Sequence, residues 1–353
     1  MSDALIAPCI GKFLFRHICS TFQIKAVGIK LIPLKLSRRG SNPFAELNVI
    51  GRLISIYKSE QPDIVHHVAL KPVLYGAFAS RVARVPMVVN AMAGLGLLFS
   101  SRSLKVRLAR PVFMLFFRFL LNRKGTRVIL QNPDDVDLMC DSGVLNNERI
   151  TLIRGSGVDT HEFKAQPEPG GEPVAILASR LLWDKGVAEF VNAARALKAE
   201  GVVARFALVG EGDIENPGSI SKEQLQAWHD EGVIELWGKR ADMQDVFAQS
   251  HIVCLPSFYG EGVPKVLIEA AACEKPIVTT DSPGCREIVR DGVNGILVPL
   301  RDSSAVAQAL KKLIESPGLR KKMGKNGREL VVREFSLDKV NRETLAIYKE
   351  LQT

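Results

Sequence analysis

Short apolar runs rich in β-branched residues alternate with segments of helical periodicity along most of this 353-residue chain. Such alternation, with continuous apolar strands, is typical of parallel sheets covered by helices on both faces. Since a domain has about 150 residues, the chain is long enough for two. The sequence therefore predicts a two-domain α/β protein with a cleft between the domains, and ligands are expected beyond the carboxyl ends of the strands.

The first half contains one set of alternating elements. Strands are expected at 31–36, 64–66, 88–90, 127–131 and 150–153, and helices at 43–60, 72–85, 103–124 and 133–142. Residues 1–26 supply no convincing first strand, loop and helix, with 4–6 a possible strand remnant and Cys9-Ile10-Gly11-Lys12 a degenerate loop. The first α/β domain is therefore expected to be incomplete at its N-terminus.

The second half repeats the alternation more regularly. Strands are expected at 174–178, 204–209, 233–236, 252–255, 277–279 and 296–298, and helices at 187–200, 221–231, 265–273, 303–315, 317–334 and 337–351. Residues 165–173 are rich in Pro, Gly and Glu and have no periodicity, as in a linker. The predicted division is a first domain over 1–164, a linker over 165–173, a second domain over 174–336, and a C-terminal helix over 337–353 that packs back on the first domain.

Charge is divided unequally between the halves. Residues 1–150 contain 21 Lys and Arg against 9 Asp and Glu, a balance of +12, whereas the remaining residues contain 26 against 29, a balance of −3. A basic half favours an anionic partner. Nucleic acid, an anionic membrane surface and a lipid diphosphate all satisfy this condition.

The six cysteines are scattered without a Cys-x-x-Cys pair, and no histidines stand at zinc-finger spacing. This pattern is typical of a reduced protein without a structural zinc site. No cleavable signal peptide and no apolar run of about 20 residues is recognisable. We therefore expect a cytoplasmic protein.

Two cations follow the predicted strand 174–178. Arg180 and Lys185 stand between the end of this strand and the start of a helix, where free N–H groups and the helix dipole favour an anion. Together they could hold a diphosphate without a metal. The alternative is a solvated Arg180 and a Lys185 lying over Trp183, and the two interpretations carry equal weight from these residues alone.

A glycine-rich loop follows the predicted strand 252–255. Gly260 and Gly262 allow close backbone approach, and the helix that follows contains Glu269 among apolar neighbours. A buried carboxylate needs partners, either sugar hydroxyls or a buried Arg. A glycosidase pair of Glu261 and Glu269 is disfavoured, because eight residues along a helix rise about 12 Å, beyond the usual carboxylate separations.

Three weaker patterns lie after other strands. Gly94 and Gly96 lack the third glycine of a dinucleotide fingerprint, and the loop that begins at Gly210 is similarly incomplete. Asp135-Val136-Asp137 resembles a metal-binding D-x-D, but it opens a helix after Asn132-Pro133. We favour the helix-start interpretation, and no metal site is predicted.

Taken together, SRLLWDKGV, the E-x7-E spacing in EGVPKVLIE and the downstream VTTDSPGCREIVRDGVNGILVP closely resemble the retaining family-4 glycosyltransferases of the GT-B fold. Smaller agreements are RGSGVDTHEF and LVGEGDIENP. The resemblance runs from about residue 27 to the C-terminus. It implies two Rossmann-like domains with parallel sheets facing across a cleft, and a metal-independent hexosyltransferase without cofactors that uses a nucleotide-sugar, with UDP as the expected nucleotide.

The resemblance also implies roles for individual residues. Arg180 and Lys185 would grip the donor diphosphate and stabilise it as leaving group, and Glu261 would meet the hydroxyls of the donor sugar. Glu269 would bind the ribose. Further donor contacts would come from the backbone of Gly262 and Val263 and from the surroundings of the base, at Gly210, Lys239 and Arg240.

SRRGSNPF and DIENP resemble the branch that acts on polyprenyl-diphosphate-linked sugars, which builds bacterial surface polysaccharide or lipopolysaccharide. The segment 104–124 has an apolar centre and basic flanks, as in a helix lying in a membrane interface. Its alternative is a buried core helix with basic ends. We expect a peripheral association of the basic first domain with the inner face of the bacterial cytoplasmic membrane, a lipid-linked saccharide acceptor, and no nucleic-acid partner.

The acceptor side is less defined. His67 follows a strand and Lys71 lies just beyond it, so with Gly94 and Gly96 they are the candidate acceptor-side residues. A histidine at the sheet edge is the alternative for His67. Two other functions remain as hypotheses: a nucleotide-sugar-binding remnant without catalysis, because of the N-terminus, and a sugar-nucleotide epimerase.

Overall fold

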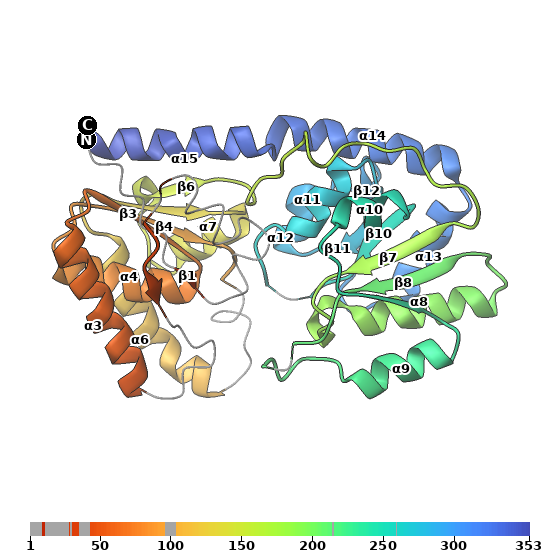
Figure 1. Cartoon of the computed structure of the whole chain (residues 1–353), viewed down its shortest axis with the longest axis horizontal. Coiled ribbons are helices and arrows are strands. Elements are labelled where there is room, and N and C mark those ends of the chain that lie inside the picture. Colours follow the sequence, from red (N-terminus) through yellow and green to blue (C-terminus); the bar gives the residue numbers. More distant parts are fainter. Residues whose placement is uncertain are drawn as a thin grey trace.

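The computed structural model describes residues 9–10, 28, 30–34, 43–95, 104–213, 215–258 and 260–353. They form two lobes side by side, each with its own parallel sheet, and the last two helices run across both (Figure 1). The predicted two-domain α/β fold is confirmed. Of residues 1–26, only Cys9–Ile10 are described, as strand β1 paired in parallel with β2 (Pro33–Leu34). Residues 37–42 of SRRGSNPF, Gly96 and Ile214 of DIENP lie outside the described residues.

The first domain is built on a four-stranded parallel sheet in which consecutive strands are neighbours. Its order is β3 (Ile64–Val68), β4 (Met87–Met92), β5 (Thr126–Leu130) and β6 (Ile150–Leu152). The helices are α3 (Pro43–Glu60), α4 (Leu70–Val82), α6 (Leu104–Leu121) and α7 (Pro133–Asp141), with a 3₁₀ turn at Asn147–Arg149. Consecutive parallel neighbours place all carboxyl ends along one edge of the sheet, which is the edge that faces the second domain (Figure 1).

The second domain has six parallel strands. Their order is β12 (Gly295–Val298), β11 (Ile277–Thr280), β10 (Ile252–Leu255), β7 (Val174–Ala178), β8 (Arg205–Val209) and β9 (Glu235–Gly238). The helices are α8 (Val187–Ala199), α9 (Lys222–Asp230), α10 (Met243–Ala248), α11 (Lys265–Ala272), α12 (Pro283–Ile288) and α13 (Ser303–Ile314), with a 3₁₀ turn at Trp183–Lys185. Because the order reverses beside β7, the loops after β7, β8 and β10 lie together.

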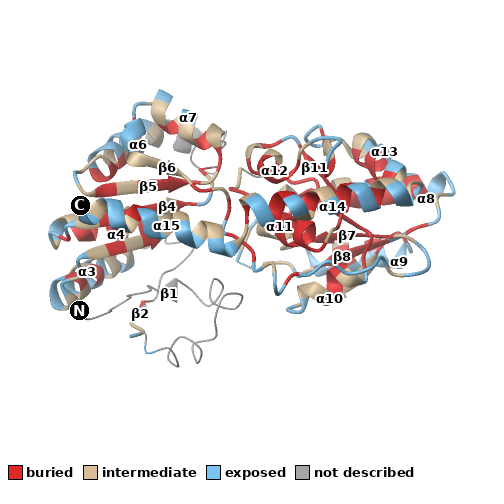
Figure 2. Cartoon of the chain, turned by 90° about the horizontal axis from the view of Figure 1, so that it is seen from above, coloured by how far each residue is buried: buried red, intermediate tan, exposed pale blue. Residues whose placement is uncertain are grey.

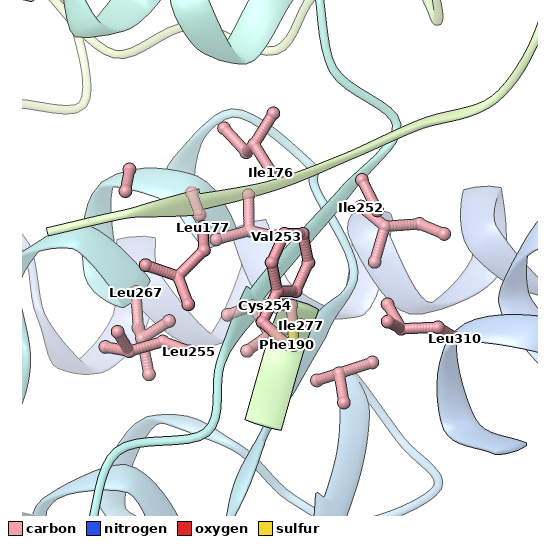
Figure 3. Close-up of a cluster of buried hydrophobic side chains, with 14 of the residues drawn as sticks. Ile176, Leu177, Phe190, Ile252, Val253, Cys254, Leu255, Leu267, Ile277 and Leu310 are labelled. Carbon is pink, nitrogen blue, oxygen red and sulfur yellow. The ribbon is translucent and has the colours of Figure 1, made fainter. Parts of the chain in front are cut away.

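The core of this domain lies under those loops. Every residue of β7 and β10 is buried, and Figure 3 shows side chains of both strands gathered around Phe190 of α8. The ring of Phe190 packs edge-on against Phe206, with ring centroids 6.1 Å apart. Truncating such a buried aromatic side chain costs about 3–5 kcal/mol. The site loops are therefore anchored on a rigid base.

The chain crosses between the domains twice. After β6 it enters the second domain, and α14 (Pro317–Glu334) and α15 (Leu337–Gln352) bring it back, so that α15 lies over the first sheet (Figure 2). Ile347 is buried in a cluster with Val89, Ile129 and Ile153. The two crossings are hydrogen-bonded to each other, because the N–H of Val158 donates to Phe335 and the N–H of Leu337 donates back to Val158.

Candidate active site

The loops after β7 and β10 touch through a glycine. Gly186 has a φ of 75°, and a β-carbon built there would lie 2.1 Å from the carbonyl oxygen of Pro256. Only glycine fits such a positive φ and so close a backbone approach. The contact brings the loop that contains Lys185 against the loop that contains Glu261.

Lys185 and Glu261 form the centre of the site. The Nζ of Lys185 lies 2.5 Å from Oε2 of Glu261, and the hydroxyl of Ser257 donates to Oε1 at 3.2 Å. Lys185 is only 7% exposed. A buried ammonium must be paired, and Glu261 is this partner, so the head group of Lys185 is not in solvent as the alternative required.

Arg180 stands at the same strand end with a different partner. Its guanidinium donates to Oδ2 of Asp213 at 3.0 Å, and Asp213 is itself held by the bond from its N–H to the hydroxyl of Ser219. The Arg180 side chain is 37% exposed. It is therefore oriented by a carboxylate and still accessible to a ligand.

Asp184 links the loop after β7 to the loop after β10. It was not predicted from the sequence as a site residue. Its carbonyl oxygen accepts from the N–H of Phe258 at 3.0 Å and from the hydroxyl of Ser257 at 3.3 Å. Burial raises the pKa of its carboxyl above the ordinary value, against the opposing charges of Lys185 and Arg180. Its Oδ1 is buried, and among the residues that the structure describes it has no hydrogen-bond partner.

Glu269 lies on α11, one helical turn beyond Lys265. Glu269 is 8% exposed, and the ammonium of Lys265 is 3.5 Å from its Oε1. The predicted burial is therefore present, with a lysine beside it. The helix begins directly after the glycine loop, which places Gly262 and Val263 at its N-terminal end.

The remaining predicted donor residues surround the ends of β8 and β9. Gly210 has a φ of 142°, and its β-carbon would lie 1.9 Å from the carbonyl oxygen of Ser179, so this strand end requires glycine. Lys239 is paired with Glu211, and Arg240 donates to Asp242 at 2.8 Å. Both cations lie on the rim of the site, where they are solvent-accessible.

The first domain contacts the glycine loop directly. A β-carbon built at Gly94, whose φ is 92°, would lie 2.6 Å from the nitrogen of Gly262. Next to it, Oε1 of Gln131 accepts from the N–H of Val263 at 3.2 Å. Gln131 was missed by the sequence analysis, although it directly follows β5, at the carboxyl edge where ligands were expected.

Two ion pairs also join the domains, both through the short helix α12. Arg286 donates to Asp134 of α7 at 3.0 Å, and Arg154 donates to Glu287 at 2.6 Å. A β-carbon at Gly284 would lie 2.0 Å from the carbonyl oxygen of Gly262, so α12 also supports the glycine loop. Residues of both domains therefore contact the glycine loop and α12.

The structure corrects the placement of His67. Its ring is 1% exposed, with Nδ1 2.8 Å from Oδ1 of Asn90 and Nε2 2.9 Å from the hydroxyl of Tyr57. Both nitrogens are therefore used inside the first domain, and burial lowers the pKa of His67 to about 4. An acceptor cannot reach this ring, and His67 is a structural histidine buried within β3, which is closer to the alternative of a histidine at the sheet edge.

Lys71 lies at the carboxyl end of β3, in the first turn of α4. Its ammonium is 2.7 Å from Oε1 of Glu46, and the hydroxyl of Tyr75 donates to the other oxygen of that carboxylate at 2.5 Å. Unlike His67, this group is partly exposed. It remains a candidate for the acceptor side.

The D-x-D motif serves the start of α7. Oδ1 of Asn132 accepts from the N–H of Asp135 at 2.7 Å, and its Nδ2 donates to the carboxylate of Asp135 at 2.9 Å. The helix-start interpretation is confirmed. Within the ranges that the structure describes, no three His, Cys, Asp or Glu side chains are grouped as metal ligands would be.

Two family models match the chain. The model described as "Glycosyl transferases group 1" matches residues 158–330, and the model described as "Glycosyl transferase 4-like" matches residues 20–132. The first match contains all the loops of the second domain described above.

Two curated relatives span most of the chain. The N,N'-diacetylbacillosaminyl-diphospho-undecaprenol alpha-1,3-N-acetylgalactosaminyltransferase of Campylobacter jejuni is 28% identical over 323 residues, which cover 87% of this chain and 82% of the relative. The UDP-Gal:alpha-D-GlcNAc-diphosphoundecaprenol alpha-1,3-galactosyltransferase of Escherichia coli is 26% identical over 303 residues, covering 81% and 76%.

Solved structures have the same fold. Anabaena Alr3699/HepE, crystallised in complex with UDP, superposes with a TM-score of 0.75 at 20% sequence identity, over 95% of this chain and 90% of that protein. The two-domain arrangement is that of the GT-B fold.

Proposed function

The chain belongs to the glycosyltransferases, and we propose that it transfers a sugar from a nucleotide-sugar to a saccharide carried on a polyprenyl diphosphate. The acceptor class is supported by the names of the two relatives, which act on saccharides attached to undecaprenol through a diphosphate. UDP is supported as the nucleotide by the UDP-bound structural neighbour and by the name of the galactosyltransferase relative. The product would enter the assembly of a bacterial surface polysaccharide.

The observation that carries this proposal is the buried Lys185 at the end of β7, with the accessible Arg180 five residues before it. Lys185 adjoins the glycine loop through its pair with Glu261. We assign the N–H groups of Gly262 and Val263, at the N-terminal end of α11, to the donor diphosphate, because a helix N-terminus favours an anion. Preorganised donors stabilise charge where it develops during a reaction. The departing nucleoside diphosphate is the group that gains charge in glycosyl transfer.

The chemistry that we propose proceeds with retention and without a metal. The bond between the sugar C1 and the phosphate oxygen breaks through an oxocarbenium-like state, and the acceptor oxygen bonds to C1 on the same face. The acceptor proton moves to the departing phosphate oxygen. Arg180 and Lys185 supply the positive charge that would otherwise come from a metal, Glu261 orients the donor sugar, and Glu269 binds the ribose.

We also propose that the first domain docks on an anionic membrane through α6. Val112, Leu115 and Phe119 are 71%, 70% and 55% exposed, and their spacing places them on one stripe of the helix. Arg81 lies over the ring of Phe119, with its guanidinium carbon 3.9 Å from the ring centroid, and Arg118 is exposed on the same helix. An apolar stripe with basic neighbours fits an anionic membrane interface, where a polyprenyl-linked acceptor would be found. None of the helices that the structure describes is both long and apolar enough to cross a bilayer.

The test is nucleotide release by the purified chain in EDTA, with a panel of nucleotide-sugars, in the presence and absence of short polyprenyl-diphosphate-sugar acceptors. Acceptor-dependent release is the expected result. Arg180→Ala should abolish it, whereas Arg195→Ala, an exposed arginine on α8, should not.

Release that requires Mg²⁺ would contradict metal independence. Donor binding without transfer would indicate a binding protein, and an isomerised nucleotide-sugar formed without acceptor would indicate an epimerase.

A further inference from the structure

Gln131 is held rigidly at the edge of the first domain that faces the glycine loop. It directly follows Leu130, the last residue of β5, and directly precedes Asn132, whose side chain is committed to capping α7. Pro133 then starts the helix with a fixed φ. The backbone on both sides of Gln131 is therefore fixed, and its side chain is aimed by the fold.

The side chain of Gln131 contacts the second domain at the glycine loop. Oε1 accepts the N–H of Val263 at 3.2 Å, and a β-carbon at Gly262 would lie 2.0 Å from the same oxygen. Glycine at position 262 therefore gives the amide its access to the loop. The contact crosses from the acceptor-side domain to the N–H that the proposed function assigns to the donor diphosphate.

We propose that Gln131 sets the donor affinity of the site, because its amide oxygen competes with an oxygen of the donor diphosphate for the N–H of Val263. This inference rests on the proposed function, because it assigns that N–H to the diphosphate. Bound donor takes the N–H and displaces the amide oxygen of Gln131. Donor binding in the second domain thereby breaks a hydrogen bond that the first domain makes to it.

The donor diphosphate should bind the N–H of Val263 more strongly than the amide oxygen of Gln131 does. A phosphate oxygen is charged, and charge-assisted hydrogen bonds are about twice as strong as bonds between neutral groups. The diphosphate is also attracted by Lys185 and Arg180, which a neutral amide is not. The donor diphosphate therefore displaces Gln131 from the N–H of Val263. The affinity for the donor is reduced by the free energy of the Gln131 hydrogen bond that it replaces, and this free energy is modest because both partners are neutral.

Two substitutions of Gln131 distinguish competition between Gln131 and the donor from direct binding of the donor by Gln131. Gln131→Ala removes the competing oxygen, so UDP should bind about three- to tenfold more tightly, as expected for the loss of one neutral hydrogen bond. Gln131→Glu has the same shape, but its carboxylate holds the N–H more strongly and repels the diphosphate. It should weaken UDP binding about tenfold or more.

The measurement is the dissociation constant of UDP by calorimetry, in EDTA, for the wild-type chain and both variants, together with the KM for the donor. Gln308→Ala and Gln308→Glu are matched controls, because Gln308 is exposed on α13, and they should bind UDP as the wild type does. A purely structural role would shift both Gln131 variants in the same direction. Weaker binding by Gln131→Ala, or no change in either variant, overturns the inference. If the wild-type chain binds no nucleoside diphosphate, the proposed function itself fails.

Discussion

The ammonium of Lys185 and the carboxylate of Glu261 lie 2.5 Å apart, although the two residues come from loops 76 positions apart in the chain. Gly186 makes this possible by letting the two loops meet. The pair keeps a buried cation compensated, and it orients Glu261 toward the loop after β7. Both residues can therefore be tested as one unit.

Replacing Lys185 by Ala should lower kcat/KM for sugar transfer about 100-fold or more, because it removes a preorganised donor from the leaving group. The measurement is transfer at several donor concentrations, with the melting temperature as a check on folding. Lys198→Ala, which changes an exposed lysine on α8, should leave the rate unchanged. Activity of the Lys185 variant within threefold of wild type would contradict the assigned role.

Gly94→Ala should separate the domains at the glycine loop. The added β-carbon would lie 2.6 Å from the nitrogen of Gly262, at a φ of 92° that is unfavourable for alanine. We expect transfer to fall about tenfold or more, since a displacement of about 1 Å at a reacting centre can cost 100-fold. Gly170→Ala is the matched control, because nothing lies within 4 Å of its β-carbon. Equal activity of the two variants would show that the close approach of Gly94 is not needed.

The stability of the first domain should fall as the pH is lowered from about 6.5 to about 4. Burial lowers the pKa of both His66 and His67 to about 4, below the ordinary value of about 6.5. Between these values the unfolded chain binds protons that the folded chain does not, so stability is present above pH 6.5 and is lost on acidification. One pKa unit corresponds to about 1.4 kcal/mol.

Melting temperatures between pH 7.5 and 4.5 check this dependence. His66→Phe removes one of the two titrating groups and should flatten the profile, whereas the same change at the exposed His161 should not. A wild-type profile that is flat over this range would refute the assignment.

Membrane binding should depend on the stripe of α6. Leu115→Glu with Phe119→Glu places two charges in the apolar stripe and should reduce sedimentation with anionic vesicles about tenfold or more. Val203→Glu adds a charge at a residue that is 65% exposed on the second domain, and it should sediment as the wild type does. Unchanged binding of the double variant would exclude α6 as the docking surface.

Much of the fold could be predicted because the strands are short apolar runs between clear breakers. The strand predicted at 252–255 coincides with β10, which lies between His251 and Pro256. The strand predicted at 233–236 is shifted, since Val233 and Ile234 are buried but pairing with β8 starts at Glu235. The short helices α10 and α12 were not predicted, because six residues are too few to establish a helical period.

The site was predictable where it is charged. Lys185 and Arg180 were identified from charge and position after a strand, but their partners, Glu261 and Asp213, depend on which loops the sheet order brings together. Gln131 follows a strand in the same way, yet a neutral amide gives no electrostatic signal. His67 was placed wrongly because a strand covered on both faces does not reveal which side chains turn inward.

The hydrogen bonds that join Val158 to Phe335 and Leu337 have a mechanical consequence. The second domain is connected to the first at both of its ends, and the two connecting segments are hydrogen-bonded to each other at one point. A domain joined by a single connection can rotate about several axes. A domain joined by two connections that are hydrogen-bonded to each other rotates about one axis near the bonded residues. Opening and closing of the site would therefore follow a single arc, with the contact of Gly94 and Gln131 at its closed end.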